Sequence, residues 1–442
     1  MMKTLVSFVS AIILSVSFSA FSKTKVTWSM ESNADRDPIF LEKLQNAYNS
    51  AQDNYELEIQ FEPNETRIES LRTSMLAGMG PDIVETPGPS YVKEYQEAGM
   101  LENLDSYADE FGWKDKLIPW AYSSGVFDGS LYAIPKTHES MVMLYNKTLF
   151  EENGWKVPTT LEELEDVAGK IKAKGMDVYT YGSSGWQPTH EHLVGIYLNN
   201  YAGPQAVYEA ITGEREWTDP VFVEALELLK KHMVDEGWWS GSLENYYAIG
   251  WDDFHAQFAT RGAAMMTIGT WTFQATSLGI GQSGDEWGWA PLPSLSSNSG
   301  GPNFMIAIGT TMSVNAAAKN KDGAIDVLNW IMSNKDVVID IASDFQFGEF
   351  VVPLLLDDSD IPSTISPQVT SYLNEYARIT GEGNYGYCTW TFWPAEPGVH
   401  IWKDMEVVWA GDISVEDFMY DHQKMWDKAR KKNETLPVPL RD

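Results

Sequence analysis

The strongest constraint on the fold is an alternation of strand-like and helix-like segments near the start of the chain. Apolar or alternating runs at 26–30, 55–61 and 82–85 are typical of strands. The two intervening segments, 38–51 and 64–78, carry apolar residues at helical spacing on one face. A strand–helix–strand–helix–strand order predicts a parallel sheet with right-handed crossovers, and hence an α/β fold.

The same alternation returns later in the chain. Thr160 and Glu163 form a capping box before an amphipathic helix, and 178–181 reads as the next strand. Further helices are predicted at 222–233, 324–331, 398–410 and 414–431. A Ser/Gly/Asn-rich piece at 294–303 is the best linker candidate. These signals fit two α/β lobes joined by several crossings.

The first residues predict export from the cytoplasm. Lys3 precedes an apolar run at 5–16, and Ala20 and Ser22 supply small residues at the positions that a signal peptidase inspects. The run is shorter than the ~20 apolar residues that a membrane span needs. We therefore expect a signal peptide at 1–22, removed after Ser22. The single cysteine, Cys388, lies far from this segment, which favours a free periplasmic protein over a lipid-anchored one.

Composition excludes several classes of protein. Removing 22 of 442 residues leaves 420, or two to three domains at about 150 residues each. With 43% hydrophobic and 13% aromatic residues the chain can build a large core, and one cysteine leaves no intrachain disulfide. The formal net charge of −32 argues against nucleic acid or an anionic membrane surface as a partner.

Four separated segments carry short motifs, at residues 76–83, 132–135 with 144–147, 158–164, and 258–265 with 269–271. They match the patterns "aG..PDi", "yaiP…lyYNk", "P.TweEl" and "F..GkaAM…G.W", in this order. In these motifs the chain resembles extracellular solute-binding protein family 1, the group that contains maltose-binding protein. Leu161 departs from the third pattern, where the family has Trp, at a position that reads as helix packing.

The resemblance implies a two-lobe periplasmic binding protein fold, class II-like, in which discontinuous α/β lobes are joined by hinge crossings. By analogy the N-terminal lobe would hold 23–136 and 300–346, and the C-terminal lobe 137–299 and 347–442. Crossings would fall near Lys136, near 294–301 and near Phe347. The first two also have a sequence signal of their own, a proline and the Gly/Ser run.

Aromatic residues are the first candidates for a ligand site, since flat rings cover the C–H faces of a sugar. The chain has 18 Trp and 20 Tyr. Trp271, at the "G.W" turn, is the strongest candidate, with core packing as the alternative. Trp390 and Trp393 lie in a loop-like aromatic stretch, and we expect one to contact ligand and the other to be core. Trp186 follows a glycine-rich strand end, where open α/β sheets place ligands.

Polar candidates lie at the ends of the predicted first-lobe strands and at the first crossing. They could bond sugar hydroxyls in fixed geometry, or they could form solvated turns and structural hinge bonds instead. The Gly-rich loop before Phe304 could also bring backbone close to a ligand. The residues are Glu31, Asn33, Asp35, Tyr91, His138, Glu139 and Phe304.

Other motifs do not support catalysis or a cofactor. The G-x-G-x-x-G match at 279–284 lacks a preceding strand, so no nucleotide cofactor is expected. His190, Glu191 and His192 lack a further ligand for a metal and read as a cleft rim or a helix start. We predict no catalytic residue, no metal and no cofactor.

The sequence therefore predicts a monomeric periplasmic component of an ABC importer. It would capture a carbohydrate, from mono- to oligosaccharide, by hinge closure and deliver it to the membrane permease. One alternative is a binding protein for a non-sugar solute, such as glycerol phosphate or a polyamine. The other is a secreted glycoside hydrolase, which would need a positioned pair of carboxyl groups.

Overall fold

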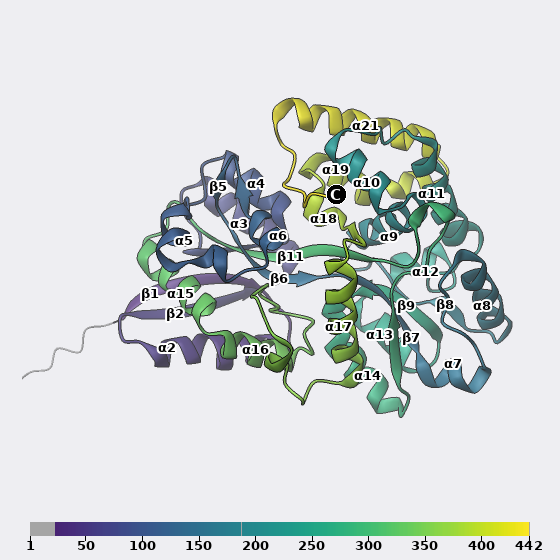
Figure 1. The fold of residues 1–442 in the computed structure, drawn as a ribbon, viewed down its shortest axis with the longest axis horizontal. Coiled ribbons are helices and arrows are strands. Elements are labelled where there is room, and N and C mark those ends of the chain that lie inside the picture. Colours follow the sequence, from purple (N-terminus) through teal and green to yellow (C-terminus); the bar gives the residue numbers. More distant parts are fainter. Residues whose placement is uncertain (1–22, 187, 442) are drawn as a thin grey trace, which may run out of the picture.

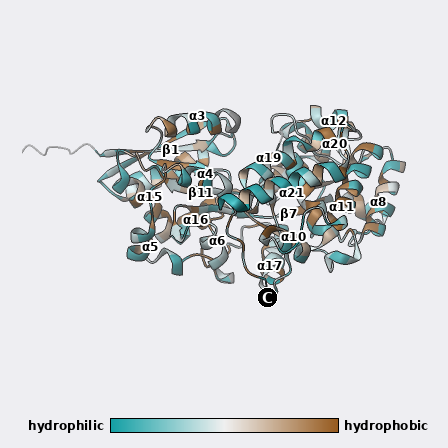
Figure 2. Cartoon of the chain, turned by 90° about the horizontal axis from the view of Figure 1, so that it is seen from above, coloured by the Kyte–Doolittle hydropathy of each residue, from teal (hydrophilic) through white to brown (hydrophobic). Residues whose placement is uncertain are grey.

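The computed structural model describes residues 23–186 and 188–441 and forms two α/β lobes side by side (Figure 1). Each lobe has its own sheet with helices packed against it. Helices lie toward the outside and strands toward the middle of each lobe (Figure 2). This architecture confirms the fold class that the sequence predicts.

The first lobe is built on a six-stranded sheet with the order β12-β11-β3-β1-β2, and β6 also pairs with β11. β1 lies parallel to β2 and β3, as the opening alternation of the sequence predicts, whereas β11 runs antiparallel to β3 and β6. The strands are β1 (Thr24–Glu31), β2 (Tyr55–Glu62), β3 (Ile83–Thr86), β6 (Ile134–Glu139), β11 (Phe304–Val314) and β12 (Tyr385–Tyr387).

The second lobe has a four-stranded sheet with the order β10-β7-β9-β8. β8 is parallel to β9, and β7 is antiparallel to both of its neighbours. A separate hairpin in the first lobe joins β4 and β5. The strands are β7 (Met141–Asn146), β8 (Asp177–Tyr179), β9 (Ala263–Gly269), β10 (Trp287–Ala290), β4 (Val126–Phe127) and β5 (Ser130–Leu131).

Two strand segments pass from one lobe to the other. β6 ends at Glu139, and after Ser140 the chain continues as β7 in the second sheet. β11 pairs with β12 at its start and with β3 at its end, and its register with β6 shifts around Thr310. Its first residues belong to the core of the second lobe, while Met312 and Val314 belong to that of the first. The lobe boundaries expected from the resemblance stay a prediction.

The helices of the first lobe flank its sheet, and a π-helical stretch, Phe40–Asn46, joins the first two. They are α1 (Asp37–Ile39), α2 (Ala47–Ala51), α3 (Asn64–Leu76), α4 (Pro89–Glu97), α5 (Asp105–Phe111), α6 (Pro119–Ser123), α15 (Lys321–Ser333) and α16 (Lys335–Asp344).

The second lobe has more helices, and α19 and α21 lie on its upper side (Figure 1). Those before β10 are α7 (Lys147–Asn153), α8 (Leu161–Ala173), α9 (Thr189–Tyr197), α10 (Pro204–Thr212), α11 (Pro220–Lys230), α12 (Leu243–Ala248), α13 (Trp251–Ala259) and α14 (Phe273–Ser283). Those at the end are α17 (Pro367–Gly381), α18 (Thr389–Phe392), α19 (Ala395–Lys403), α20 (Met405–Ala410) and α21 (Val415–Lys432).

Local sequence signals explain where several helices begin and end. The side chain of Asn146 accepts a hydrogen bond from the amide of Leu149 at 2.8 Å and caps α7. Gly154 ends that helix with φ of 63°, a conformation that glycine adopts without steric cost. Thr160 caps α8 through the amide of Glu163. The Thr160 cap confirms the predicted start of this helix.

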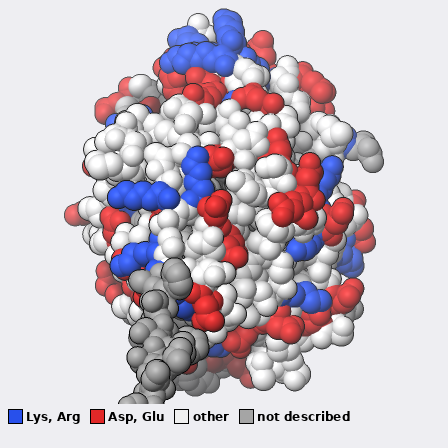
Figure 3. Space-filling view, turned by 90° about the vertical axis from the view of Figure 1, so that its left-hand side faces the viewer, with Lys and Arg blue, Asp and Glu red and all other residues white. Residues whose placement is uncertain are grey.

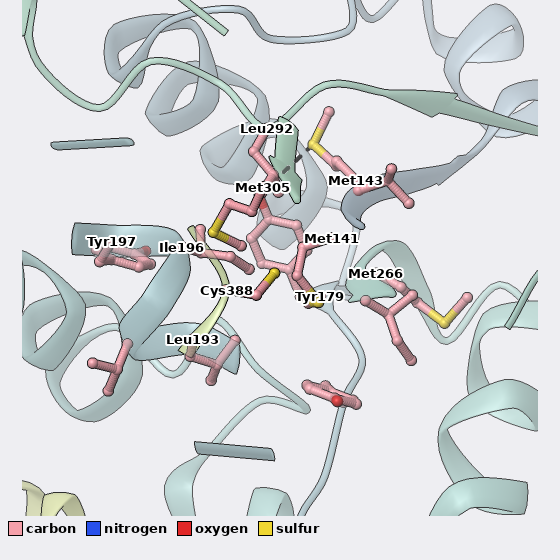
Figure 4. Packing of buried hydrophobic residues seen from close by; sticks show 14 of the residues in the cluster. Met141, Met143, Tyr179, Leu193, Ile196, Tyr197, Met266, Leu292, Met305 and Cys388 are labelled. Atoms are coloured by element: carbon pink, nitrogen blue, oxygen red, sulfur yellow. Dashed lines mark hydrogen bonds between the residues drawn. The ribbon is translucent and has the colours of Figure 1, made fainter. Parts of the chain in front are cut away.

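The core of the second lobe is rich in sulfur and aromatic side chains. Met141, Met143, Met305 and Cys388 gather in its centre (Figure 4), and the hydroxyl of Tyr179 donates to the sulfur of Met143 at 3.9 Å. Cys388 is buried and free. Flexible methionine side chains fill irregular gaps, so this core does not depend on a disulfide.

The chain end ties the two lobes together. After α21 the tail returns to the first lobe, where Leu436 packs into a cluster with Leu71 and Met75. Asn433 donates to Asp128 of the β4–β5 turn at 3.1 Å. Arg441 then donates to the carbonyl oxygen of Tyr385 in β12.

Charges are mixed on the end of the first lobe that Figure 3 shows. Lys and Arg side chains lie among Asp and Glu there, so the described atoms of this face form no continuous basic patch. In the described part of the chain, no helix is both long and apolar enough to cross a membrane. The predicted signal peptide at 1–22 lies outside the described residues.

Candidate ligand-binding site between the lobes

Two indole rings and one imidazole ring meet beside the crossing strands. Trp271 lies in the 3₁₀ turn Thr270–Thr272 that follows β9, Trp390 lies in α18 and His192 in α9. The His192 ring centroid is 5.3 Å from that of Trp271 and 4.9 Å from that of Trp390. The two indoles lie edge to face at 5.9 Å. We call Trp271, Trp390 and His192 the ring cluster.

Two glycines allow Trp271 to sit where it does. A Cβ added to Gly269 would lie 1.8 Å from Cζ3 of Trp271, so the indole lies directly on this glycine. A Cβ on Gly348 would lie 2.6 Å from the carbonyl oxygen of Thr270. Any other residue at either position would displace the turn, which explains the Gly-x-Trp spacing in physical terms.

A buried carboxyl group contacts the ring cluster from the crossing. Trp390 Nε1 donates to Oε1 of Glu139, the last residue of β6, at 3.1 Å. Glu139 is 8% exposed. Burial, reinforced by the nearby charge of Glu349, raises its pKa well above the usual value, while the hydrogen bond from Trp390 opposes that rise. The carboxyl group is thus fixed in place and lies against Gly309.

A second buried carboxyl group lies on the other side of His192. Glu191 accepts a hydrogen bond from the hydroxyl of Thr389 at 2.8 Å, and burial raises its pKa to about 8. The hydroxyl of Tyr181 lies 2.6 Å from Nδ1 of His192. Burial also lowers the pKa of His192 to about 3, so its ring is neutral at physiological pH.

Charged side chains of the first lobe face this region in pairs. Arg36 forms an ion pair with Glu349 and lies 3.6 Å from Glu31, and Lys136 pairs with Glu85. Burial raises the pKa of Glu31 despite the neighbouring guanidinium. The cations here are therefore already neutralised by carboxylates.

The start of α4 brings the first lobe into contact with the ring cluster. Gly88 precedes this helix with φ of 98°, and a Cβ there would lie 2.7 Å from the carbonyl oxygen of Trp390. Tyr91, in the first turn, has its pKa raised to about 12 by burial and by the charge of Glu191. Residues of both lobes thus surround the same buried region.

Comparison with known proteins identifies the family. A family model described as bacterial extracellular solute-binding protein matches residues 32–338. The chain belongs to this family. A Brucella abortus (strain 2308) protein named as a binding protein is 29% identical over 209 residues, which are 47% of this chain and 49% of that relative. The match therefore spans about half the length of this relative.

Two further comparisons extend the similarity. The maltotriose-binding protein of Pyrococcus abyssi (strain GE5 / Orsay) is 24% identical over 314 residues, 69% of this chain and 62% of that protein. Among solved structures, a chitin oligosaccharide binding protein superposes with a TM-score of 0.76 at 19% identity, covering 92% of this chain and 99% of that one. At this identity the structural likeness shows a shared fold.

In this solute-binding protein, the structure brings together five of the residues that the sequence singles out. Trp271, Trp390 and Glu139 are in or beside the ring cluster. Glu31 and Tyr91 face it from the first lobe. The charge of Glu31 contributes to the raised pKa of Glu139, and the charge of Glu191 contributes to the raised pKa of Tyr91. Their part in ligand binding stays a prediction.

The described contacts of four other candidates lie outside the ring cluster. His138 points to the opposite face of β6 from Glu139, and its Nδ1 lies 2.9 Å from the carbonyl oxygen of Val351. The side chain of Asn33 accepts from the amide of Asp35 at 3.0 Å in a surface turn. Trp186 is half-buried in the loop after β8.

Trp393 and Phe304 are buried in the core of the second lobe, and for the tryptophan pair this is the expected arrangement with one of the two rings in the core. Trp393 is 1% exposed, packs against Trp217 and Trp426, and donates to His422 at 3.2 Å. Phe304 is fully buried at the start of β11 against aromatic rings of β10 and α17. The stretch around Trp393 is also not a loop, because β12 and α18 occupy most of it.

Sequence reasoning missed several residues that complete the site. His192 and Glu191 read as a cleft rim or a helix start, and the helix start is confirmed because α9 begins at Thr189. The ring of His192 also contacts Trp271 and Trp390, and Glu191 accepts from Thr389 beside Trp390. Arg36 and Glu349 are 313 positions apart and carry no local signal of their pairing. Among the described residues, no group of three or more His, Cys, Asp or Glu side chains is placed to hold a metal ion.

Proposed function

We propose that this protein binds a carbohydrate between its lobes and delivers it to the permease of an ABC importer. The observation that carries the proposal is the edge-to-face pair Trp271–Trp390, with the Glu139 carboxyl group hydrogen-bonded to one indole. Indole faces cover the C–H surface of a sugar, and carboxyl oxygens accept its hydroxyl hydrogens.

The charge pattern favours an uncharged ligand. Lys136 and Arg36 are each engaged by a carboxylate, so a phosphate ester would have to displace an existing ion pair. The raised pKa values of Glu139 and Glu191 favour their neutral forms, which weakens attraction for a polyamine. Neutral carboxyl groups both donate and accept hydrogen bonds, as a hydroxyl-rich ligand requires.

Binding would proceed by relative motion of the lobes. Both indoles belong to the second lobe, and Gly88 of the first lobe lies against Trp390, so the lobes would move apart to admit a sugar and close on it again. A shift from mostly open to mostly closed needs about 5 kcal/mol of preferential binding to the closed form. Two ring faces and several satisfied hydroxyl bonds can supply that.

We further propose that the protein is a monomeric periplasmic component and not an enzyme. The family description names extracellular solute binding, and a relative is named for maltotriose, which fits an exported sugar carrier. The permease would recognise the closed form. A glycoside hydrolase remains an outcome of the test: incubation with oligosaccharides should release no reducing ends.

A thermal-shift screen followed by calorimetry tests the proposal. Mono-, di- and trisaccharides would be compared with glycerol phosphate and spermidine, because a ligand at 100 times its Kd adds about 2.7 kcal/mol of stability. Trp271→Ala should weaken sugar affinity ten-fold or more, while Tyr420→Ala, at a 56% exposed residue of α21, should leave it unchanged. Stabilisation by a non-sugar alone would overturn the proposal.

A further inference from the structure

One indole of the second lobe remains exposed outside the ring cluster. Trp251, the first residue of α13, is 40% exposed, and it is the only exposed residue among the 18 Trp, all of which lie in the described part of the chain. Its centroid is 5.4 Å from that of Phe254 and 4.6 Å from that of His255. The ring is therefore held by its neighbours while a large part of it remains exposed to solvent.

The topology puts Trp251 at the same sheet edge as Trp271. α13 leads into the amino end of the parallel strand β9, so its own start lies at the carboxyl edge, where Trp271 leaves β9. The loop after β8 ends at that edge too and carries Trp186. Its Ser184 amide donates to the carbonyl oxygen of Ile249 at 3.1 Å, beside the start of α13. Ligands of open α/β sheets bind at this edge.

A continuous run of rings connects Trp251 to the ring cluster. Phe254 lies 5.3 Å from Tyr181, Tyr181 lies 6.1 Å from His192, and His192 lies 5.3 Å from Trp271. All three intervening rings are buried, and the hydroxyl of Tyr181 is bonded to His192. Packed side chains thus fix the exposed indole relative to the inner pair.

We propose that Trp251 forms an outer subsite that stacks on a second or later sugar residue, so that the ligand is an oligosaccharide. The inference rests on the proposed function and adds the length of the ligand to it. The inner sugar residue would lie against the Trp271–Trp390 pair, and the rest of the oligosaccharide would extend along the sheet edge past Trp186. Burying the open face of Trp251 against a sugar ring would add affinity only for ligands long enough to reach it.

Calorimetry with matched sugars tests this subsite. The probes are maltotriose and glucose, and chitotriose and N-acetylglucosamine. Trp251→Ala should weaken the binding of the preferred trisaccharide about tenfold and change that of its monosaccharide by less than twofold. Trp251→Phe should retain most of the affinity, because an aromatic face remains. Tyr420→Ala serves as the control for loss of an exposed ring elsewhere.

The outcomes separate the two proposals. Trisaccharide binding that is unaffected by Trp251→Ala would overturn the outer subsite and leave the sugar-binding function intact. An equal loss for monosaccharide and trisaccharide would also overturn it, since Trp251 would then act on the inner site. Failure of every sugar to bind the wild-type protein would overturn the proposed function and the subsite together. Thermal unfolding of each variant confirms that the fold is retained.

Discussion

Trp390 and Glu139 are 251 positions apart in the sequence, yet their side chains are joined by a 3.1 Å hydrogen bond. One comes from a short helix of the second lobe and the other from the end of the strand that leaves the first sheet. The bond holds an indole and a buried carboxyl group in fixed relation at the place where the lobes meet. Both the ring and the acid are then pre-positioned for a ligand.

A double-mutant cycle measures this bond. Trp390→Phe keeps an aromatic ring but leaves the buried carboxyl group without its donor, which costs about 1–3 kcal/mol. Glu139→Leu removes the acceptor and keeps a side chain of similar size. We expect a coupling energy of about 1–2 kcal/mol from urea unfolding of the two single variants and the double variant. Additive effects would show that the bond contributes nothing to stability.

The pKa of Glu191 makes stability depend on pH. Because the folded-state pKa is about 8, against 4.5 ordinarily, the folded protein retains a proton that the unfolded chain releases. The contribution is fully present below pH 4.5 and is lost as the pH rises through about 8. Relative to Glu191→Gln, the wild-type protein should lose about 3 kcal/mol between pH 5 and 8.5.

Urea unfolding of both proteins at several pH values tests this slope. Comparing the wild type with a neutral isostere cancels the contributions of His192 and other titrating groups. Glu162→Gln, at an exposed position in α8, provides the control and should follow the wild type across the range. A constant difference between wild type and Glu191→Gln would contradict the prediction.

The local parts of the fold were predictable, whereas long-range partners were not. Strand and helix alternation, the Thr160 cap and the Gly-x-Trp turn at Trp271 follow from neighbouring residues, and the structure has them. Trp390 and Trp393 share one aromatic stretch, and only packing against Trp217 and Trp426 decides that the second is core. Those partners come from separate elements, so no local pattern reveals them.

Pairings between distant segments of the chain were hidden for the same reason. Arg36 and Glu349 belong to segments that only the folded chain brings together. Phe304 follows a Gly-rich loop, which suggested a backbone near ligand, but β11 begins there and carries its ring into the core. A strand that serves both lobes gives no signal of which core each of its ends will join.

Gly309 should tolerate no side chain. A Cβ there would lie 2.2 Å from Oε2 of Glu139, so alanine would push the carboxyl group away from Trp390. We expect a loss of about 1–3 kcal/mol, typical of overpacking, measured as a lower midpoint in urea. Gly281→Ala in α14 is the matched control, because a Cβ there meets nothing within 4 Å. Equal stability of the two variants would refute the contact.

Trp271 and Trp393 should respond differently to truncation. Trp393→Ala removes a fully buried ring from the core and should cost about 3–5 kcal/mol of unfolding free energy. Trp271 is only partly buried, so Trp271→Ala should cost less stability and instead reduce sugar affinity. Urea unfolding and calorimetry on the same two variants separate the effects. A greater loss of stability at Trp271 than at Trp393 would reverse their assignment.

The C-terminal tail should stabilise the first lobe through a single residue, although it follows a helix of the second lobe. Leu436 is 7% exposed in the first-lobe cluster with Leu71 and Met75. Leu436→Ala should cost about 2 kcal/mol of unfolding free energy, at the low end for a buried leucine because the site lies at the surface.

Leu440→Ala is the matched control in the same tail. Its side chain is 85% exposed, so truncation should change stability by less than about 0.5 kcal/mol. The comparison isolates burial from any effect of shortening a tail residue. If both variants unfold at the wild-type urea concentration, the tail does not hold the lobes together. If only Leu436→Ala unfolds at a lower urea concentration, then Leu436, more than 350 positions after Leu71 in the sequence, contributes directly to the stability of the first lobe.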